Sequence, residues 1–166
     1  VLGEKIILET IFSFVDYMET TVAAFEQDGS IIGKVLCGNS YCSLLKETIE
    51  SAKASEGARK YLEQRQAVVH AAIASGHQEE TGAAGITICV APVMANGKAV
   101  GAILGGVSEV PSNEKIIRDV AETTGADLKK LQEAASQVFH KPDYLYDAAR
   151  RHLHRLAGTL GKLYED

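Results

Sequence analysis

The stretch ITICVAPVMANGKAVGAILGGV, residues 86–107, constrains the fold more than any other part of the sequence. Asn96-Gly97 is a strong hairpin dipeptide, because both residues tolerate the positive φ angles of a two-residue turn. Apolar residues fill nearly every position on either side of this turn. A strand with one wet face would alternate apolar and polar residues, so we expect helices to cover both faces of this pair.

A second hairpin is predicted over residues 21–35, where two β-prone runs flank Asp28-Gly29. Helices are predicted over 4–19, over 40–51 and from Ser55 to Gly76, and Ser112 and Asp127 are expected to cap two more. The polar stretch SGHQEETGAAG, residues 75–85, is predicted to be a loop. This order of helix, hairpin, helices, hairpin and helices predicts an α+β domain, with a PAS- or GAF-like antiparallel sheet flanked by helices.

Length and charge narrow the class of protein. A chain of 166 residues is long enough for one domain with its own core. The net charge of -5 argues against nucleic acid as a direct partner. No segment has the ~20 apolar residues of a membrane span, and VLGEKIILET does not resemble a signal peptide, so we expect no membrane association. An odd count of three cysteines speaks against a disulfide framework and favours a reducing compartment, the cytoplasm.

The cysteines allow more than one interpretation. Cys37 and Cys42 stand close together in GKVLCGNSYCSLLKET, and Cys89 lies in the apolar hairpin. A zinc site would need a second pair of ligands, which the sequence does not supply. Free cysteine is also among the most buried residue types, so these thiols fit the wall of a pocket. We therefore expect no metal and no cofactor. The alternative is a cysteine-based metal, haem or redox sensor that uses Cys37, Cys42 and Cys89.

Catalytic motifs are absent from the sequence. There is no GxSxG, HExxH or P-loop pattern. A nucleophilic Cys42 would need a histidine base that the sequence does not place beside it. We therefore expect that the chain is not an enzyme.

The last predicted helix, from Asp143 onward, has heptad spacing. Its apolar positions are Ala149, Leu153, Leu156, Leu160 and Leu163, which step by four and three residues in turn. We interpret residues 1–142 as a sensor domain and residues 143–166 as a C-terminal signalling helix of the same domain. The stripe either forms the seam of a homodimer or packs on its own domain, and the sequence leaves both interpretations open.

Four stretches together resemble the PocR-type sensory domain of bacterial signalling proteins, over about residues 5–164. They are AAFEQDGSII, SYCSLLKE, AGITICVAPVMANGKAVGAILGGV and VAETTGADLKKLQEAASQV. The third is the most specific, and its matching positions are Gly85, Pro92, Gly97, Gly101 and Gly106. Cys42 falls on a cysteine of the family. Gly82 and Ala83 stand where many members have cysteine and histidine, which argues further against a metal site.

The resemblance implies a PAS-like domain that encloses a ligand pocket. It also implies binding of small hydrocarbon-derived compounds such as diols, and regulation of transcription or of a fused kinase. We expect a small, largely apolar ligand between sheet and helices, near residues 41–45 and 82–89, and an output domain outside this chain. The residues predicted to line the pocket are Phe14, Phe25, Cys37, Tyr41, Cys42, Leu45, Ala83 and Cys89.

Overall fold

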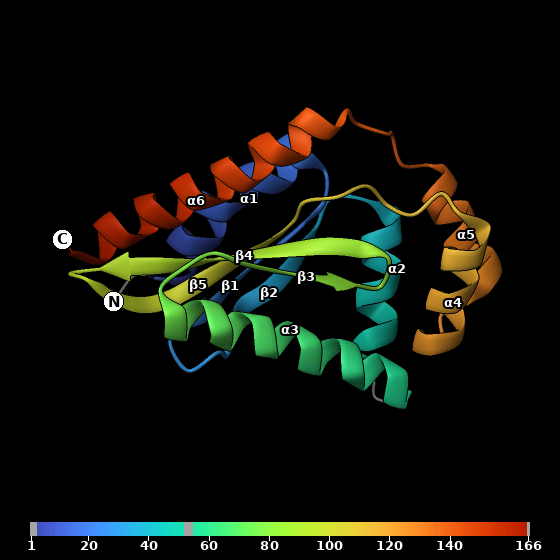
Figure 1. Cartoon of the computed structure of the whole chain (residues 1–166), viewed down its shortest axis with the longest axis horizontal. Coiled ribbons are helices and arrows are strands. Elements are labelled where there is room, and N and C mark those ends of the chain that lie inside the picture. Colours follow the sequence, from blue (N-terminus) through green and yellow to red (C-terminus); the bar gives the residue numbers. More distant parts are fainter. Residues whose placement is uncertain (1–2, 52–54, 166) are drawn as a thin grey trace.

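The computed structural model describes residues 3–51 and 55–165, which form one antiparallel sheet of five strands and six helices (Figure 1). The strands are β1 (Thr21–Glu26), β2 (Ile31–Cys37), β3 (Glu79–Ala83), β4 (Ile86–Ala95) and β5 (Lys98–Gly106). The helices are α1 (Glu4–Met18), α2 (Ser40–Ile49), α3 (Glu56–Ser75), α4 (Glu114–Thr124), α5 (Leu128–Ser136) and α6 (Asp143–Glu165). The predicted α+β class with a C-terminal helix is confirmed.

The strand order is β2-β1-β5-β4-β3, so strands that are far apart in the sequence become neighbours. β1 pairs along β5 from Val22 opposite Gly105 to Glu26 opposite Gly101. This pairing joins the first hairpin to the second and makes β5 the central strand. The result is the PAS-like sheet that the order of predicted elements suggested.

Residues with positive φ form the turn between β4 and β5 and the turn between β3 and β4. Asn96 and Gly97 have φ of 52° and 78°, which confirms the predicted turn between β4 and β5. Ala84 and Gly85, with φ of 53° and 82°, form the turn between β3 and β4. The loop predicted over residues 75–85 is therefore wrong for Glu79–Ala83, which is a strand paired with β4. Glycine and glutamate have low β propensity, and here pairing with an apolar neighbour overrides that propensity.

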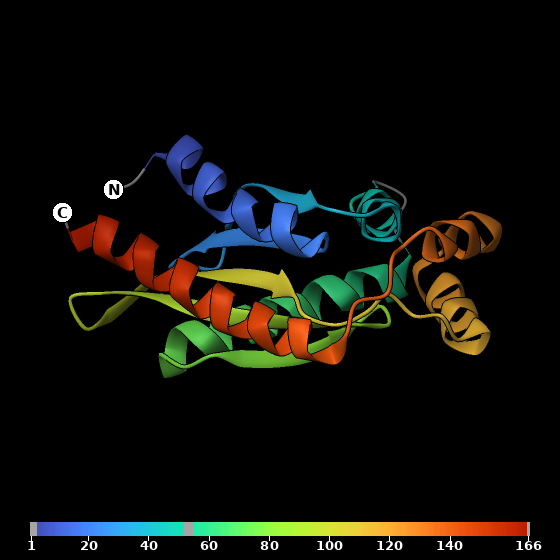
Figure 2. The same cartoon turned by 90° about the horizontal axis from the view of Figure 1, so that it is seen from above.

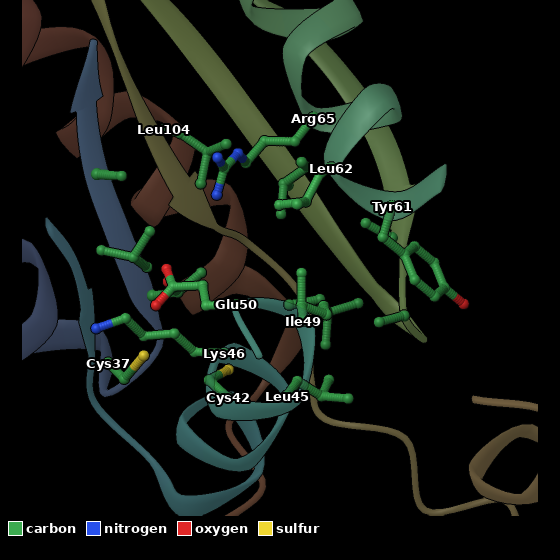
Figure 3. A pocket seen from close by; sticks show the side chains of 17 residues that line it. Cys37, Cys42, Leu45, Lys46, Ile49, Glu50, Tyr61, Leu62, Arg65 and Leu104 are labelled. Carbon is green, nitrogen blue, oxygen red and sulfur yellow. The ribbon is translucent and has the colours of Figure 1, made fainter. Parts of the chain in front are cut away.

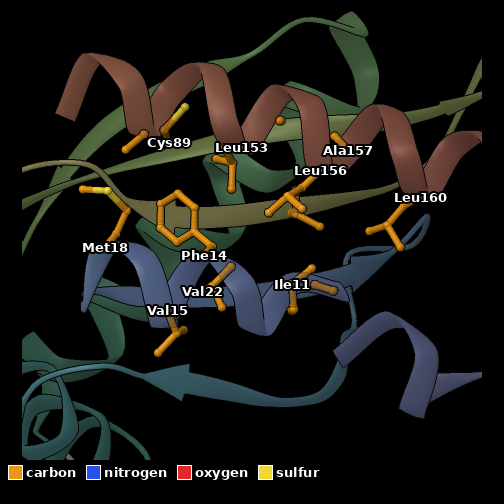
Figure 4. Packing of buried hydrophobic residues seen from close by; sticks show 14 of the residues in the cluster. Ile11, Phe14, Val15, Met18, Val22, Cys89, Leu153, Leu156, Ala157 and Leu160 are labelled. Atoms are coloured by element: carbon orange, nitrogen blue, oxygen red, sulfur yellow. The ribbon is translucent and has the colours of Figure 1, made fainter. Parts of the chain in front are cut away.

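Helices cover both faces of the sheet, as the apolar hairpin predicted. Figure 1 shows α1 and α6 on one face and α3 on the other. The cluster under α1 and α6, the first core cluster, includes the fully buried Phe14 and Leu153 and is shown in Figure 4. The cluster under α3 includes Phe25, Val69 and Leu104. Successive residues of a strand point to opposite faces, so β1, β4 and β5 each contribute buried residues to both clusters.

The remaining helices lie at one end of the sheet, where α2, α4 and α5 form a third cluster around Tyr41 and Leu131 (Figure 2). Asp127 caps α5, as predicted. The predicted cap Ser112 is wrong by one residue, because α4 begins at Glu114 and the Asn113 side chain accepts from the backbone N–H groups of Lys115 and Ile116. None of the helices in the described part of the chain is long and apolar enough to cross a membrane.

The heptad leucines of α6 pack within their own chain. Leu153 and Leu160 are 0% and 1% exposed, and Leu156 is 9% exposed. All three contribute to the first core cluster, against α1 and the sheet. Leu163, at 37% exposed, is the one leucine of the stripe that meets solvent. The structure thus supports the interpretation in which α6 packs on its own domain.

Candidate functional site

A cavity of about 120 Å³ lies between α2, α3 and the face of the sheet that α3 covers (Figure 3). Helix α2 lines it with Cys42, Leu45, Lys46 and Ile49, and its C-cap Glu50 adds a fifth side chain. Helix α3 lines it with Tyr61, Leu62 and Arg65. The sheet and its turns add mostly small or branched apolar residues, among them Ala23, Ala83, Ile88 and Leu104. A mostly apolar wall with a few polar groups is the usual composition of a small-molecule site.

Asn39 sets the position of α2 against the end of α1. Its side-chain oxygen accepts a hydrogen bond from the backbone N–H of Cys42 over 2.8 Å, which caps the helix. Its Nδ2 donates to the carbonyl oxygen of Glu19 over 2.9 Å. From this fixed start, Cys42, Leu45 and Ile49 recur at helical spacing, so one side of α2 faces the cavity.

Tyr41 anchors α2 to the turn between β3 and β4. Its ring is fully buried, and its hydroxyl donates to the carbonyl oxygen of Ala84 over 2.8 Å. Burial raises the pKa of the Tyr41 phenol above its ordinary value, so the group stays a neutral donor. Ala84 lines the cavity whereas Tyr41 lies just behind this wall, with its hydroxyl already paired inside the protein.

Three charged side chains are among those that line the cavity, and Figure 3 shows them. Lys46 belongs to α2, Glu50 is the C-cap of that helix, and Arg65 comes from α3. The guanidinium carbon of Arg65 lies 5.6 Å from the centroid of the Phe25 ring, in a cation–π contact. Burial lowers the pKa of Arg65 from its usual range, and the charge of Glu50 opposes this shift. The buried Nε of Arg65 has no hydrogen-bond partner among the described residues.

The three cysteines do not converge. Cys37 and Cys42 line the cavity, whereas Cys89 belongs to the first core cluster on the other face of the sheet. Its Sγ accepts a hydrogen bond from Nε2 of Gln78 over 2.8 Å. Within residues 3–51 and 55–165, no group of three or more histidine, cysteine, aspartate or glutamate side chains is arranged to hold a metal ion. A metal or haem site built from all three thiols therefore does not fit this arrangement.

Burial also keeps the thiols protonated. It raises the pKa of Cys42 to about 12 and that of Cys89 to about 11, and it raises the pKa of Cys37 as well. The thiolate is the form that attacks disulfides and binds metals, so these thiols are poor nucleophiles at neutral pH. The cavity is therefore suited to hold a ligand by apolar and charged contacts, rather than to react with it through a thiolate.

The predicted site residues fall into three groups. Cys37, Cys42, Leu45 and Ala83 line the cavity. Tyr41 lies directly behind its wall, and Phe25 lies beneath Arg65. Phe14 and Cys89 are on the opposite face, where the Phe14 ring stacks on His152 with centroids 6.0 Å apart. The structure therefore does not bring these last two to the cavity. Cys89 points away because Ile88 and Val90, on either side of it, face α3.

The charged residues of the cavity were missed in the sequence, although α3 carries a signal for one of them. Ala58, Leu62, Val69 and Ala72 step along the buried side of the helix, with a gap of seven residues between Leu62 and Val69. Arg65 fills the position in that gap. An arginine on an apolar stripe marks a place where the helix faces something other than a closed core.

Comparison with known proteins adds the family. No curated protein matches the chain. The family model described as the sensory domain found in PocR matches residues 4–164, which is nearly the whole sequence. This match covers every strand and all but the last residue of α6. The chain therefore belongs to the family of PocR sensory domains.

Proposed function

We propose that this sensory domain responds to a small, largely apolar molecule that binds in the cavity between α2, α3 and the sheet. The observation that carries the proposal is the apolar wall of this cavity, which includes Leu45, Ile88 and Leu104. An apolar cavity of roughly 150 Å³ in another protein takes up benzene, so a cavity of about 120 Å³ suits a small ring or a short branched chain. A neutral hydrocarbon derivative or a small amphipathic molecule meets this description.

Signal transfer is proposed to pass through the helices that meet at the cavity. A ligand that contacts α2 and α3 would favour one arrangement of these helices over others. The bond from Asn39 to Glu19 connects α2 to the end of α1, and α2 also packs on α5, which precedes α6. The start of α1 and the end of α6 lie at the same end of the molecule (Figure 2). We propose that residues 143–166 act as the signalling helix toward an output domain that controls transcription or a kinase.

A non-catalytic role and a cytoplasmic location are part of the same proposal. Membership of a sensory family supports the first. Three unpaired thiols fit a reducing compartment, which supports the cytoplasmic location.

Homodimer formation also stays a prediction. Because α6 uses its leucines internally, a second copy would need another surface, and α1 exposes Ile6, Phe12 and Tyr17.

The proposed function is tested by filling the cavity. Ala83→Leu adds three carbon atoms to its wall, whereas Thr81→Leu changes the same strand two residues away, outside the lining. We expect native mass spectrometry or a thermal-shift screen of small alcohols, acids and aromatics to find a ligand that stabilises the wild type and Thr81→Leu, because a ligand that binds only the folded state raises Tm. Ala83→Leu should lose this response. An equal response in all three proteins would place the binding elsewhere.

A further inference from the structure

The cavity wall contains a partly buried cation, Arg65, that forms no ion pair in the described part of the chain. The Nε of Arg65 is buried and has no hydrogen-bond partner among the described residues. None of the ion pairs formed in the described part of the chain involves Arg65. A buried donor that stays unpaired is costly, because its hydrogen bond to water has been lost without replacement. Such a group in a cavity wall indicates a ligand with an acceptor atom.

The charges around Arg65 indicate the charge of that ligand. Lys46 and Arg65 are positive and Glu50 is negative, so the three groups leave one unit of positive charge at the cavity. Glu50 is an exposed residue that water can solvate, whereas Arg65 is partly buried beside apolar residues. One negative charge on the ligand balances this set. A second negative charge would meet the carboxylate of Glu50 and be repelled.

The shape of Arg65 indicates the kind of anion. A guanidinium presents parallel N–H groups that match the two oxygens of a carboxylate. The ring of Phe25 lies 5.6 Å from the guanidinium carbon and limits the orientations of this group. Figure 3 shows the guanidinium among the side chains that line the cavity, beside Leu104. The ligand's charged group would therefore meet a donor that is already oriented, and its apolar body would lie against Leu45 and Leu104.

We propose that the ligand is a small monocarboxylic acid, which binds as its carboxylate to Arg65 and places an apolar body of about four to six carbon atoms in the cavity. This inference rests on the proposed function, because it names the class of ligand for the same cavity. A small aromatic acid or a short branched acid has the required size and charge. The same bodies without a charge, as amides or alcohols, fill the cavity but leave Arg65 without its counter-ion.

Matched acids and amides test this inference. The probes are benzoate with benzamide and 3-methylbutanoate with 3-methylbutanamide, titrated by calorimetry into the wild-type chain near neutral pH. We expect each acid to bind about 10-fold or more tightly than its amide, because a charge-assisted pair replaces an unpaired donor. In Arg65→Gln the affinity for the acid should fall by about 10- to 100-fold, with little change for the amide. Lys60→Gln removes an exposed positive charge from the same helix, and it should change neither the affinity for the acid nor the affinity for the amide.

Glu50→Gln provides a second test of the same inference, which can be used even if Arg65→Gln folds poorly. Loss of this negative neighbour should tighten binding of the acid and leave the amide unaffected, and a gain of affinity cannot come from misfolding. The inference is overturned if the amides bind as tightly as the acids, or if no acid binds. If amides or alcohols still bind, and Ala83→Leu blocks their binding, the proposed ligand cavity is supported and only the inference of an acidic ligand is wrong. Where no probe of either kind binds, both proposals fail for ligands of this size.

Discussion

The hydroxyl of Tyr41 donates to the carbonyl oxygen of Ala84 over 2.8 Å, and this bond joins α2 to the β3–β4 turn beside the cavity. Both residues are buried, so water cannot replace the bond if it is lost. The contact connects two parts of the cavity wall that are more than 40 residues apart in the sequence. It therefore fixes the distance between the helix that carries Cys42 and Leu45 and the strand that carries Ala83.

Tyr41→Phe should lower the free energy of unfolding by about 1–2 kcal/mol, because the buried carbonyl of Ala84 loses its side-chain donor. Urea unfolding followed by circular dichroism measures the change. Tyr144→Phe is the matched control, since Tyr144 is 68% exposed and its hydroxyl meets water. Equal stability of Tyr41→Phe and the wild type would mean that this bond does not hold the cavity wall in place.

Two glycines of α6 should respond to alanine in opposite ways. A Cβ at position 161 would overlap the carbonyl oxygen of Met94, so Gly161→Ala must move α6 away from β4 and lower stability. A Cβ at position 158 meets nothing within 4 Å. Gly158→Ala should therefore raise the free energy of unfolding by up to about 1 kcal/mol, through helix propensity alone. The same urea experiment compares the two, and a loss of stability in both would contradict the packing of α6 described above.

The buried thiols predict slow chemistry near neutral pH. Cys42 and Cys89 should resist iodoacetamide at about pH 8 in the folded protein and react fully in denaturing urea, because only thiolates are alkylated. Mass spectrometry of the digested protein measures each site. Rapid labelling of the folded protein, or a disulfide between Cys37 and Cys42 under mild oxidation, would instead favour the redox-sensor alternative.

The same thiols predict a loss of stability in alkali. The folded-state pKa values of about 12 for Cys42 and about 11 for Cys89 lie above the ordinary thiol value of 9.0, so the unfolded chain loses these protons first. Their contribution is complete below pH 9.0 and declines as the pH rises through the folded-state values. The decline in unfolding free energy above pH 9.0 should be smaller in Cys42→Ala than in the wild type. Parallel curves for the two proteins would contradict the burial of Cys42.

A homodimer, if it forms, should depend on α1 rather than on the leucines of α6. Phe12 is 52% exposed, so Phe12→Glu should leave the fold intact and weaken association in sedimentation experiments at increasing concentration. Leu156→Asp should instead lower the free energy of unfolding, because Leu156 is buried within its own chain. A wild type that stays monomeric at high concentration would remove the prediction of a homodimer for this segment.

Much of the fold follows from local signals in the sequence. Asp28-Gly29 and Asn96-Gly97 mark turns because their backbone preferences are local, and Ser55 and Asp127 cap helices for the same reason. β3 was missed because an edge strand of polar residues and glycine is stabilised by its neighbour rather than by its own pattern.

The face of the sheet to which a residue points was harder to predict. β4 is apolar on both faces, so its sequence does not reveal that Ile88 faces α3 whereas Cys89 faces α6. That ambiguity explains why the sequence groups Cys89 with Cys42. Arg65 was missed because a charged residue on a helix normally meets solvent, and only the assembled cavity shows where its guanidinium points.

The most direct test of the account is to locate a bound probe by NMR. Methyl groups of Leu45, Ile88 and Leu104 line the cavity, whereas those of Leu153 and Leu160 lie on the other face of the sheet. When benzoate or benzyl alcohol is added to methyl-labelled protein, the account predicts concentration-dependent shifts in the first group and none in the second. Shifts confined to Leu153 and Leu160, or no shift in any methyl group with either probe, would contradict it.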